Sequence, residues 1–259
     1  MDKWVGKTAV VTGASAGIGA QLIIDLASAG INVIGLARRA EKVQEIADKH
    51  KTLPGKIHAR KCDVSIVSDI KETFKWIEAT FGGCEILINN AAKLKYMNIF
   101  NNEDEEDNTK DVIETINTNL TGVILCAQEA FKLMTKRDVY GYIINVNSVS
   151  GHLYTYDPEW RENVYPATKH GVKAATEVMR VELAAMKNLK IRISSISPGL
   201  VKTDIFKAAG MGENFDTVFE EWPTLYPEDV SDAVLYLLKT KSHVNIREIT
   251  IQATGEKLN

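Results

Sequence analysis

The chain has 259 residues, of which 45% are apolar and 25% charged, and its formal net charge is −3. This composition is typical of a globular protein, and a chain of this length can bury a substantial core without disulfide bridges or a structural metal. The small negative charge provides no long-range attraction for nucleic acid or for an anionic lipid surface, so we expect neither as a partner.

The cysteines and the N-terminus bear on the cellular compartment. Cys62, Cys84 and Cys126 are far apart and form no CxxC pair, and the five histidines show no metal-ligand spacing. We therefore expect reduced thiols and no metal site. The first apolar segment is too short for a signal peptide, and no segment reaches the roughly 18–20 apolar residues that a membrane span needs. The sequence predicts a soluble cytoplasmic protein.

Short apolar runs alternate with longer amphipathic ones along the chain. The run at 8–13 predicts a strand that ends in a glycine turn, and 17–29 predicts a helix that Gly30 caps. Further strands are expected at 31–37, 56–64, 85–91, 142–148, 190–197 and 246–252. Further helices are expected at 39–50, 66–81, 108–136, 164–187 and 227–239.

The repeated strand–helix–strand order predicts a parallel sheet, because its strands are rich in Val, Ile and Leu and so are buried on both faces. Right-handed crossovers make this an α/β fold with a Rossmann-type doubly wound sheet of about seven strands and helices on both faces. No linker or repeat divides the chain, so we expect one domain over 1–259. The acidic run at 101–107 is interpreted as a solvated loop. The segment at 199–226 is too long for a simple connector and predicts a lid or substrate loop.

A glycine-rich turn, TGASAGIG at 12–19, joins the first strand to the first helix. In this context Gly13 allows a tight turn, Gly17 lets the backbone approach a phosphate, and Gly19 lets the helix pack close to the strand. The helix N-terminus then presents free N–H groups and the positive end of its dipole to a pyrophosphate. A turn without a ligand is the alternative at this point, because G-x-x-x-G-x-G differs from the commoner G-x-G-x-x-G.

The end of the second predicted strand indicates which dinucleotide the fold would bind. An acidic residue at this place suits the ribose 2′-hydroxyl of NAD, whereas an arginine suits the 2′-phosphate of NADP. Ala37 stands at the acid position, and Arg38 and Arg39 follow it. A guanidinium can form a forked contact with phosphate. We therefore expect NADP(H), with Arg38 as the principal contact and Arg39 either a second contact or the start of a solvated helix.

The segment NVYPATKHG at 163–171 places Tyr165 and Lys169 one helical turn apart, so both can face one cleft. A tyrosine with its ordinary pKa of about 10 is a poor base at neutral pH, but a nearby ammonium favours the phenolate. Such pairs also occur as simple surface contacts, so the spacing alone does not decide. Pro166 is compatible with a helix only in its first turn.

Several segments come in an order and at separations that resemble the short-chain dehydrogenase/reductase family. They are TGASAGIG at 12–19, NNAA at 89–92, Asn119, Ser148 and YPATK at 165–169. The resemblance covers nearly the whole chain, and Ala92 is a departure from the family's NNAG. Within the family, NVNSVSGH, YPATKHGV, ISPGLVKTDI and YPEDVSDAVLYLL are most similar to the farnesol dehydrogenase and dehydrogenase/reductase member 11 group.

The resemblance implies a catalytic set of four residues. Tyr165 exchanges the proton of the substrate hydroxyl, and Lys169 favours the phenolate and bonds the nicotinamide ribose. Ser148 donates a hydrogen bond to the substrate oxygen, with Ser150 as a nearby rival. Asn119 holds a water in the proton relay.

Asn117 competes with Asn119 for that relay position. The resemblance also implies that Asp63 meets the adenine, that Asn90 and Ala91 border the adenosine ribose, and that Thr203 bonds the carboxamide. The full set expected to bind NADP(H) is Gly13, Ser15, Ala16, Gly17, Ile18, Gly19, Arg38, Arg39, Asp63, Val64, Asn90, Ala91, Tyr165, Lys169, Pro198, Gly199, Val201 and Thr203.

These features together predict an NADP(H)-dependent oxidoreductase that transfers a hydride between the nicotinamide and an apolar alcohol or its carbonyl. Farnesol-like isoprenoid alcohols come first by resemblance. The alternatives are a reductase of steroids or small carbonyl and dicarbonyl compounds, and a cofactor-binding regulatory protein, against which the intact Ser–Tyr–Lys set argues. The resemblance further implies a homodimer or homotetramer that associates through the helices at 108–136 and 164–187.

The substrate pocket is expected to be shaped by two loops. The first is HLYTYDPEWRE at 152–162, in which His152 can line the pocket. The second is the 199–226 loop, whose apolar side chains can serve as core or as a lid that moves on Gly210 and Gly212. These side chains are Ile205, Phe206, Met211, Phe215, Phe219 and Trp222.

Overall fold

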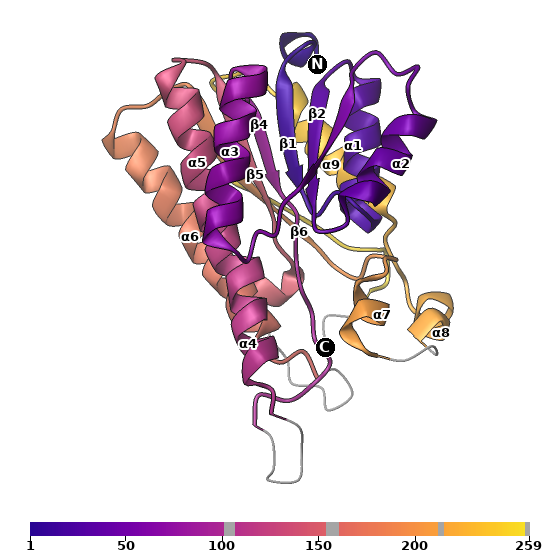
Figure 1. Ribbon diagram of the computed structural model, residues 1–259. Helices are drawn as coiled ribbons and strands as arrows, with labels where there is room; N and C mark the ends of the chain where they lie inside the picture. Colours follow the sequence, from indigo (N-terminus) through magenta and orange to yellow (C-terminus); the bar gives the residue numbers. More distant parts are fainter. Residues whose placement is uncertain (101–106, 154–160, 212–214, 257–259) are drawn as a thin grey trace.

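The computed structural model describes residues 1–100, 107–153, 161–211 and 215–256. Within them one sheet of seven parallel strands has the order β3-β2-β1-β4-β5-β6-β7 (Figure 1). The strands are β1 (Thr8–Thr12), β2 (Asn32–Ala37), β3 (Ile57–Lys61), β4 (Ile86–Asn89), β5 (Gly141–Val146), β6 (Ile191–Pro198) and β7 (Glu248–Ile251). The predicted doubly wound α/β fold is confirmed.

Helices cover both faces of the sheet, and each face has its own apolar core (Figure 1). The first face packs against α1 (Gly17–Ser28), α2 (Ala40–Lys49) and α9 (Pro227–Lys239). The second packs against α3 (Val67–Phe81), α5 (Gly122–Lys136) and α6 (Tyr165–Ala185). Every residue of β1, β4, β5 and β6 is buried, whereas the edge strands β3 and β7 are mostly half-buried. Coverage on both faces explains why the central strands read as continuous apolar runs.

Two regions differ from the expected elements. The helical run expected at 108–136 consists of α4 (Thr109–Ile116), a wide π-helical turn, η2 (Asn117–Thr121), and α5. The segment after β6 contains two short helices, α7 (Ile205–Ala209) and α8 (Phe215–Glu221), that lie beyond the carboxyl ends of the strands (Figure 1). Most of the acidic run at 101–107, most of the 152–162 loop, and Gly212 lie outside the described residues.

The strand order places a topological switch point between β1 and β4. From β1 the chain moves outward to β2 and β3, then returns to β4 on the other side of β1. The connections that leave the carboxyl ends of β1 and β4 therefore run in opposite directions. Ligands bind in the crevice between such diverging connections in sheets of this kind. No helix of the described residues is both long and apolar enough to cross a membrane.

Candidate active site

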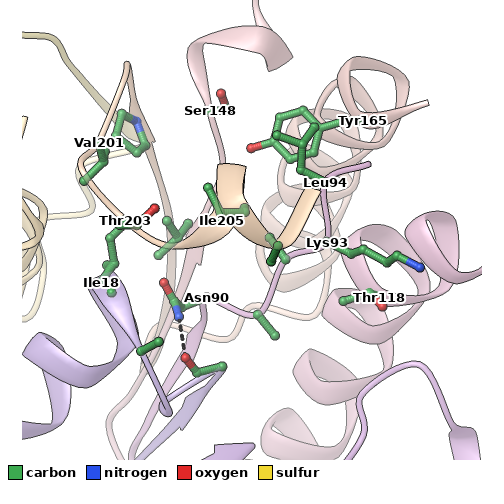
Figure 2. A pocket seen from close by; sticks show the side chains of 18 of the residues that line it. Ile18, Asn90, Lys93, Leu94, Thr118, Ser148, Tyr165, Val201, Thr203 and Ile205 are labelled. Atoms are coloured by element: carbon green, nitrogen blue, oxygen red, sulfur yellow. Dashed lines mark hydrogen bonds between the residues drawn. The ribbon is translucent and has the colours of Figure 1, made fainter. Parts of the chain in front are cut away.

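A cavity of about 440 Å³ lies at the carboxyl ends of the strands (Figure 2). Its walls come from the β1–α1 turn, the ends of β2, β4 and β5, the start of α6 and the segment after β6. These segments are distant in the sequence, and the parallel sheet brings them to one edge.

The β1–α1 turn fits against the end of β4 too closely for side chains. A Cβ at Gly13, whose φ is +69°, would lie 2.8 Å from the Cα of Ala91, and a Cβ at Gly19 would lie 2.2 Å from the Gly13 carbonyl oxygen. The Thr12 Oγ1 accepts hydrogen bonds of 3.0 Å from the backbone N–H groups of Asn90 and Ala91. The turn and the end of β4 thus form one rigid floor of the cavity.

The first turn of α1 opens onto this floor. Ala16, at the N-cap position, has an extended backbone, and no side chain caps the helix. Gly17 has a φ of +53°, and a Cβ there would lie 2.9 Å from the Thr203 Cγ2, so the turn also abuts the segment after β6. Ile18 and Thr203 accordingly lie near each other on the cavity wall (Figure 2). The uncapped N–H groups suit an anion, the ligand that such helix ends favour.

The end of β2 forms a basic part of the cavity. Ala37 is buried, and the exposed Arg38 and Arg39 that follow it both line the cavity. Asp63, at the end of β3, is the neighbouring acid, but its Oδ1 accepts hydrogen bonds from the backbone N–H and the hydroxyl of Ser65 at 2.9 and 2.7 Å. No carboxylate therefore stands at the β2 end itself.

Lys169 lies inside the protein at the other end of the cavity. Pro166 falls in the first turn of α6, and Lys169, only 3% exposed, follows one turn later. Its Nζ donates a 3.0 Å hydrogen bond to the Val146 carbonyl and lies 5.4 Å from the centre of the Tyr165 ring. Burial lowers the pKa of the Lys169 ammonium to about 8.

The pKa of Tyr165 is raised rather than lowered by the protein's own groups. Burial is the largest cause, the charge of Glu162 adds to it, and the nearby Ser148 hydroxyl acts in the opposite direction. The neutral phenol is thus the favoured form. The expectation that Lys169 by itself favours the phenolate is outweighed, because burial disfavours charge on both groups.

Ser148 follows β5 and points to the same end of the cavity as Tyr165 (Figure 2). Its Oγ accepts a 3.1 Å hydrogen bond from the Ser150 N–H, which starts the short helix η3 (Val149–Gly151). This bond leaves the Ser148 hydroxyl proton free to be donated into the cavity. Ser150 also lines the cavity, but Ser148 is the serine whose hydroxyl lowers the pKa of Tyr165.

Asn119 is buried and does not line the cavity, whereas its neighbour Thr118 does. The Asn119 Oδ1 accepts a 2.7 Å hydrogen bond from the Lys93 backbone N–H, and its Nδ2 donates to the Lys93 carbonyl at 2.8 Å. The Nδ2 also donates to the Thr168 Oγ1 at 3.2 Å. The Asn119 side chain therefore ties the end of β4 to α6. Its position in η2 agrees with the tendency of π turns to occur at functional sites.

The cavity also has a mainly apolar part. Leu94, Leu153, Ile205, Phe206 and Trp222 line it. The Phe219 ring packs edge-on against Phe206 with centroids 5.9 Å apart, and the side chain of Phe215 lies outside the described residues. α7 and the residues around it thus form part of the cavity wall.

His152 does not line this wall. Its Nε2 lies 2.6 Å from the Glu248 Oε1, and its Nδ1 lies 3.0 Å from the Lys173 Nζ. The histidine therefore fixes the chain after η3 to α6 and β7.

The cavity brings together most of the residues singled out in the sequence. Ser148, Tyr165 and Lys169 line it, as do all the residues expected to bind NADP(H) except Gly19. Glu162 and Glu256 also line it and were not anticipated. Glu162 is three residues from Tyr165, so its carboxyl could have been noticed. No sequence motif points to Glu256, because it reaches the site only through the path of the chain after β7.

Comparisons with known proteins agree with this geometry. The model of the short chain dehydrogenase family matches residues 7–214. A farnesol dehydrogenase of Aedes aegypti is 44% identical over 99% of this chain and 100% of its own. A dehydrogenase/reductase SDR family member 11 of Homo sapiens is 36% identical over 99% of this chain and 97% of its own. The closed form of a serine dehydrogenase complexed with NADP+ superposes with a TM-score of 0.78 at 28% identity, covering 94% of each chain.

Proposed function

Because this chain belongs to the short-chain dehydrogenase/reductase family of oxidoreductases, we propose that it interconverts an apolar alcohol and its carbonyl compound with NADP(H). The observation that carries the proposal is the single cavity in which Tyr165, Lys169 and Ser148 meet at one end and Arg38 follows β2 at the other. Three polar groups for proton transfer and a phosphate-binding end suit a nicotinamide dinucleotide enzyme.

The residues present fit NADP(H). The uncapped start of α1 and the glycine floor suit a diphosphate, since a side chain at Gly13 would collide with Ala91. Arg38 and Arg39 suit a 2′-phosphate, and Ala37 has no side-chain acceptor for a 2′-hydroxyl. A related protein of known structure is complexed with NADP+. When bound, NADP(H) supplies or accepts the hydride.

The three polar side chains then divide the proton chemistry. Ser148 donates a hydrogen bond to the substrate oxygen and holds it near the Tyr165 hydroxyl. In the direction of reduction, Tyr165 donates its proton to that oxygen, a role that suits the neutral phenol favoured by burial. Lys169 stabilises the phenolate that results, provided that it carries its proton. In oxidation the same groups act in reverse.

Asn119 contributes to this site in a way that differs from the expected one. Both polar atoms of its side chain are already bonded to Lys93 and Thr168. The role of the Asn119 side chain is therefore to hold α6 in position relative to the end of β4. If Asn119 binds a relay water, its backbone makes that contact.

The apolar wall supports an apolar substrate, with a farnesol-like isoprenoid alcohol as the first candidate because a farnesol dehydrogenase is 44% identical. Steroids and small carbonyl or dicarbonyl compounds are the alternatives. The proposal also includes that the protein is a homodimer or homotetramer in the cytoplasm.

The experiment is a panel of isoprenoid, steroid and short-chain alcohols assayed for reduction of NADP+, with the matching carbonyl compounds assayed for oxidation of NADPH. We expect turnover with NADP(H), highest for isoprenoid alcohols. Tight NADPH binding without turnover of any compound would instead indicate a regulatory protein, and a preference for NAD(H) would contradict the cofactor assignment.

A further inference from the structure

Glu162 is fixed beside the reacting end of the cavity. Its carbonyl accepts a 3.0 Å hydrogen bond from the Tyr165 N–H, which begins α6. On its other side Glu162 forms a β-bridge with Met97, where the Met97 N–H donates to the Arg161 carbonyl at 2.9 Å. The backbone therefore fixes Glu162 just before the start of α6. Glu162 lines the cavity, and its charge acts on the Tyr165 phenol.

The carboxyl of Glu162 has no hydrogen-bond or ion-pair partner among the described residues. The cations that line this end of the cavity or adjoin Glu162 in the sequence have other partners. The Lys93 Nζ lies 2.7 Å from Asp111 and 2.5 Å from Glu114, and the Lys169 Nζ donates to Val146. The Arg161 guanidinium lies 5.8 Å from the centre of the Tyr96 ring. Burial without a partner raises the pKa of Glu162 to about 7. A half-buried carboxyl that lines a cavity and has no protein partner is placed to accept a hydrogen bond from a ligand.

The other carboxylates that line the cavity differ from Glu162. Glu256 accepts hydrogen bonds from the backbone N–H groups of Leu200 and Ala253 at 2.9 and 3.2 Å, and so supports the segment after β6. Asp63 is bonded within its own turn by Ser65. Both therefore have structural partners. The third, Asp204, is exposed to solvent, whereas Glu162 is half-buried and has no partner.

We propose that Glu162 determines substrate specificity by accepting a hydrogen bond from a donor on the carbon next to the reacting one. This inference rests on the proposed function and narrows it to apolar compounds that carry a second hydroxyl or an amino group, such as α-hydroxy ketones and vicinal diols. Ser148 and Tyr165 hold the reacting oxygen, and Glu162 holds the second group. A site that pairs a half-buried, otherwise unpartnered acceptor with a substrate hydroxyl discriminates against an analogue that lacks this hydroxyl.

The test compares three aryl ketones that differ only at the neighbouring carbon: 2-hydroxyacetophenone, 2-methoxyacetophenone and acetophenone. The hydroxyl is a hydrogen-bond donor, whereas the methoxy group keeps the oxygen at the same place but has no donor. Oxidation of NADPH is measured for the wild type, for Glu162→Met, which keeps the volume but has no carboxyl, and for Glu162→Gln. Glu182→Met, an exposed residue of α6, is the matched control. Binding of NADPH to each variant, followed by fluorescence, verifies that the fold is intact.

We expect the wild type to favour the hydroxy ketone over the methoxy ketone by about tenfold or more in kcat/KM. Glu162→Met abolishes this preference, Glu162→Gln keeps part of it through its carbonyl oxygen, and the control keeps all of it. Equal losses on all three ketones in Glu162→Met would overturn the inference, since the residue would then act on Tyr165 or on packing.

A wild type that shows no preference, or that reduces none of the three ketones, would also overturn it. The proposed function fails separately, because it requires turnover in the panel of alcohols and carbonyl compounds described above. If the wild type turns over a compound of the panel but shows no preference for the hydroxy ketone, the proposed function remains supported and only the role of Glu162 is contradicted.

Discussion

Lys169 is a buried ammonium with one carbonyl acceptor and no carboxylate partner in the described part of the chain. Its pKa is lowered from 10.5 to about 8. The unfolded chain therefore binds more protons than the folded one between those two values, and stability rises with pH across that window. At neutral pH the buried charge costs about 3 kcal/mol, from about 1.4 kcal/mol for each unit of pKa.

This cost predicts that Lys169→Met stabilises the protein at pH 7 even though it removes a catalytic group. The gain is reduced by the unpaired Val146 carbonyl, so we expect a rise in Tm of roughly 3–6 °C. The advantage shrinks toward pH 10, where the wild-type lysine is neutral when folded. Calorimetry at the two pH values measures it, with the exposed Lys71→Met as control. A lower Tm than wild type at pH 7 would contradict the calculation.

Arg38 provides the second prediction for a single residue. Replacing it with Asp adds a carboxylate that repels the 2′-phosphate and can accept from a 2′-hydroxyl. We expect the ratio of kcat/KM for NADP+ to that for NAD+ to fall by about 100-fold or more, since a forked charged contact is lost and repulsion is gained. Arg39→Asp is the matched comparison and has the smaller effect. If neither ratio moves, the assignment of the β2 end is wrong.

The π turn η2 is the element that connects the floor of the cavity to α6. Asn119→Ala removes two hydrogen bonds to the Lys93 backbone and one to Thr168, and leaves buried groups unpaired. We expect a loss of about 1–3 kcal/mol in the free energy of unfolding and at least about tenfold in kcat.

The control is Asn117→Ala in the same turn, because the Asn117 side chain makes no hydrogen bond to another described residue. Denaturant unfolding and steady-state kinetics on both variants separate the two asparagines. A larger loss of stability and kcat in Asn117→Ala than in Asn119→Ala would show that Asn117, and not Asn119, has this role.

The elements show where sequence patterns stop being informative. The helical run at 108–136 is visible from its periodicity, but one widened turn within it shifts the pattern by a single residue and leaves no clear trace. α7 and α8 have five and seven residues, too few for a period to appear, so their segment looked like a long loop. The end of β1, by contrast, is predictable from the sequence, because the close contact with Ala91 requires a glycine at Gly13, directly after the strand.

At the scale of the whole molecule, the order of the strands determines the site. Parallel strands with right-handed crossovers must bring their carboxyl ends to one edge, so the residues after β1, β2, β4, β5 and β6 could be grouped from the sequence. Glu256 could not, because its place under Gly199 depends on the path of the chain after β7. The missing partner of Glu162 is equally invisible in the sequence, since it depends on what surrounds the side chain.

Assembly is a further property of the whole molecule. Val178 and Val181 lie one turn apart on α6 and are 55% and 66% exposed, and Ile113 on α4 is 52% exposed. Such apolar positions are costly unless covered, and they lie on the helices proposed to form the interface.

We predict that Val181→Glu breaks a wild-type dimer or tetramer into 28.7 kDa monomers in light scattering. Val67→Glu, at an exposed apolar position of α3, serves as the control and leaves the assembly intact. A monomeric wild type, or a Val181→Glu variant that keeps the wild-type mass, would show that these helices do not form the interface.

The central claim is that the Tyr165 hydroxyl transfers the proton that accompanies hydride transfer. The most direct measurement compares single turnovers of NADPH with a reducible carbonyl in the wild type, in Tyr165→Phe and in Tyr236→Phe, an exposed control on α9. We predict that Tyr165→Phe binds NADPH with unchanged affinity and loses at least about a thousandfold in rate, while the control keeps the wild-type rate. Turnover by Tyr165→Phe at the wild-type rate would contradict the account.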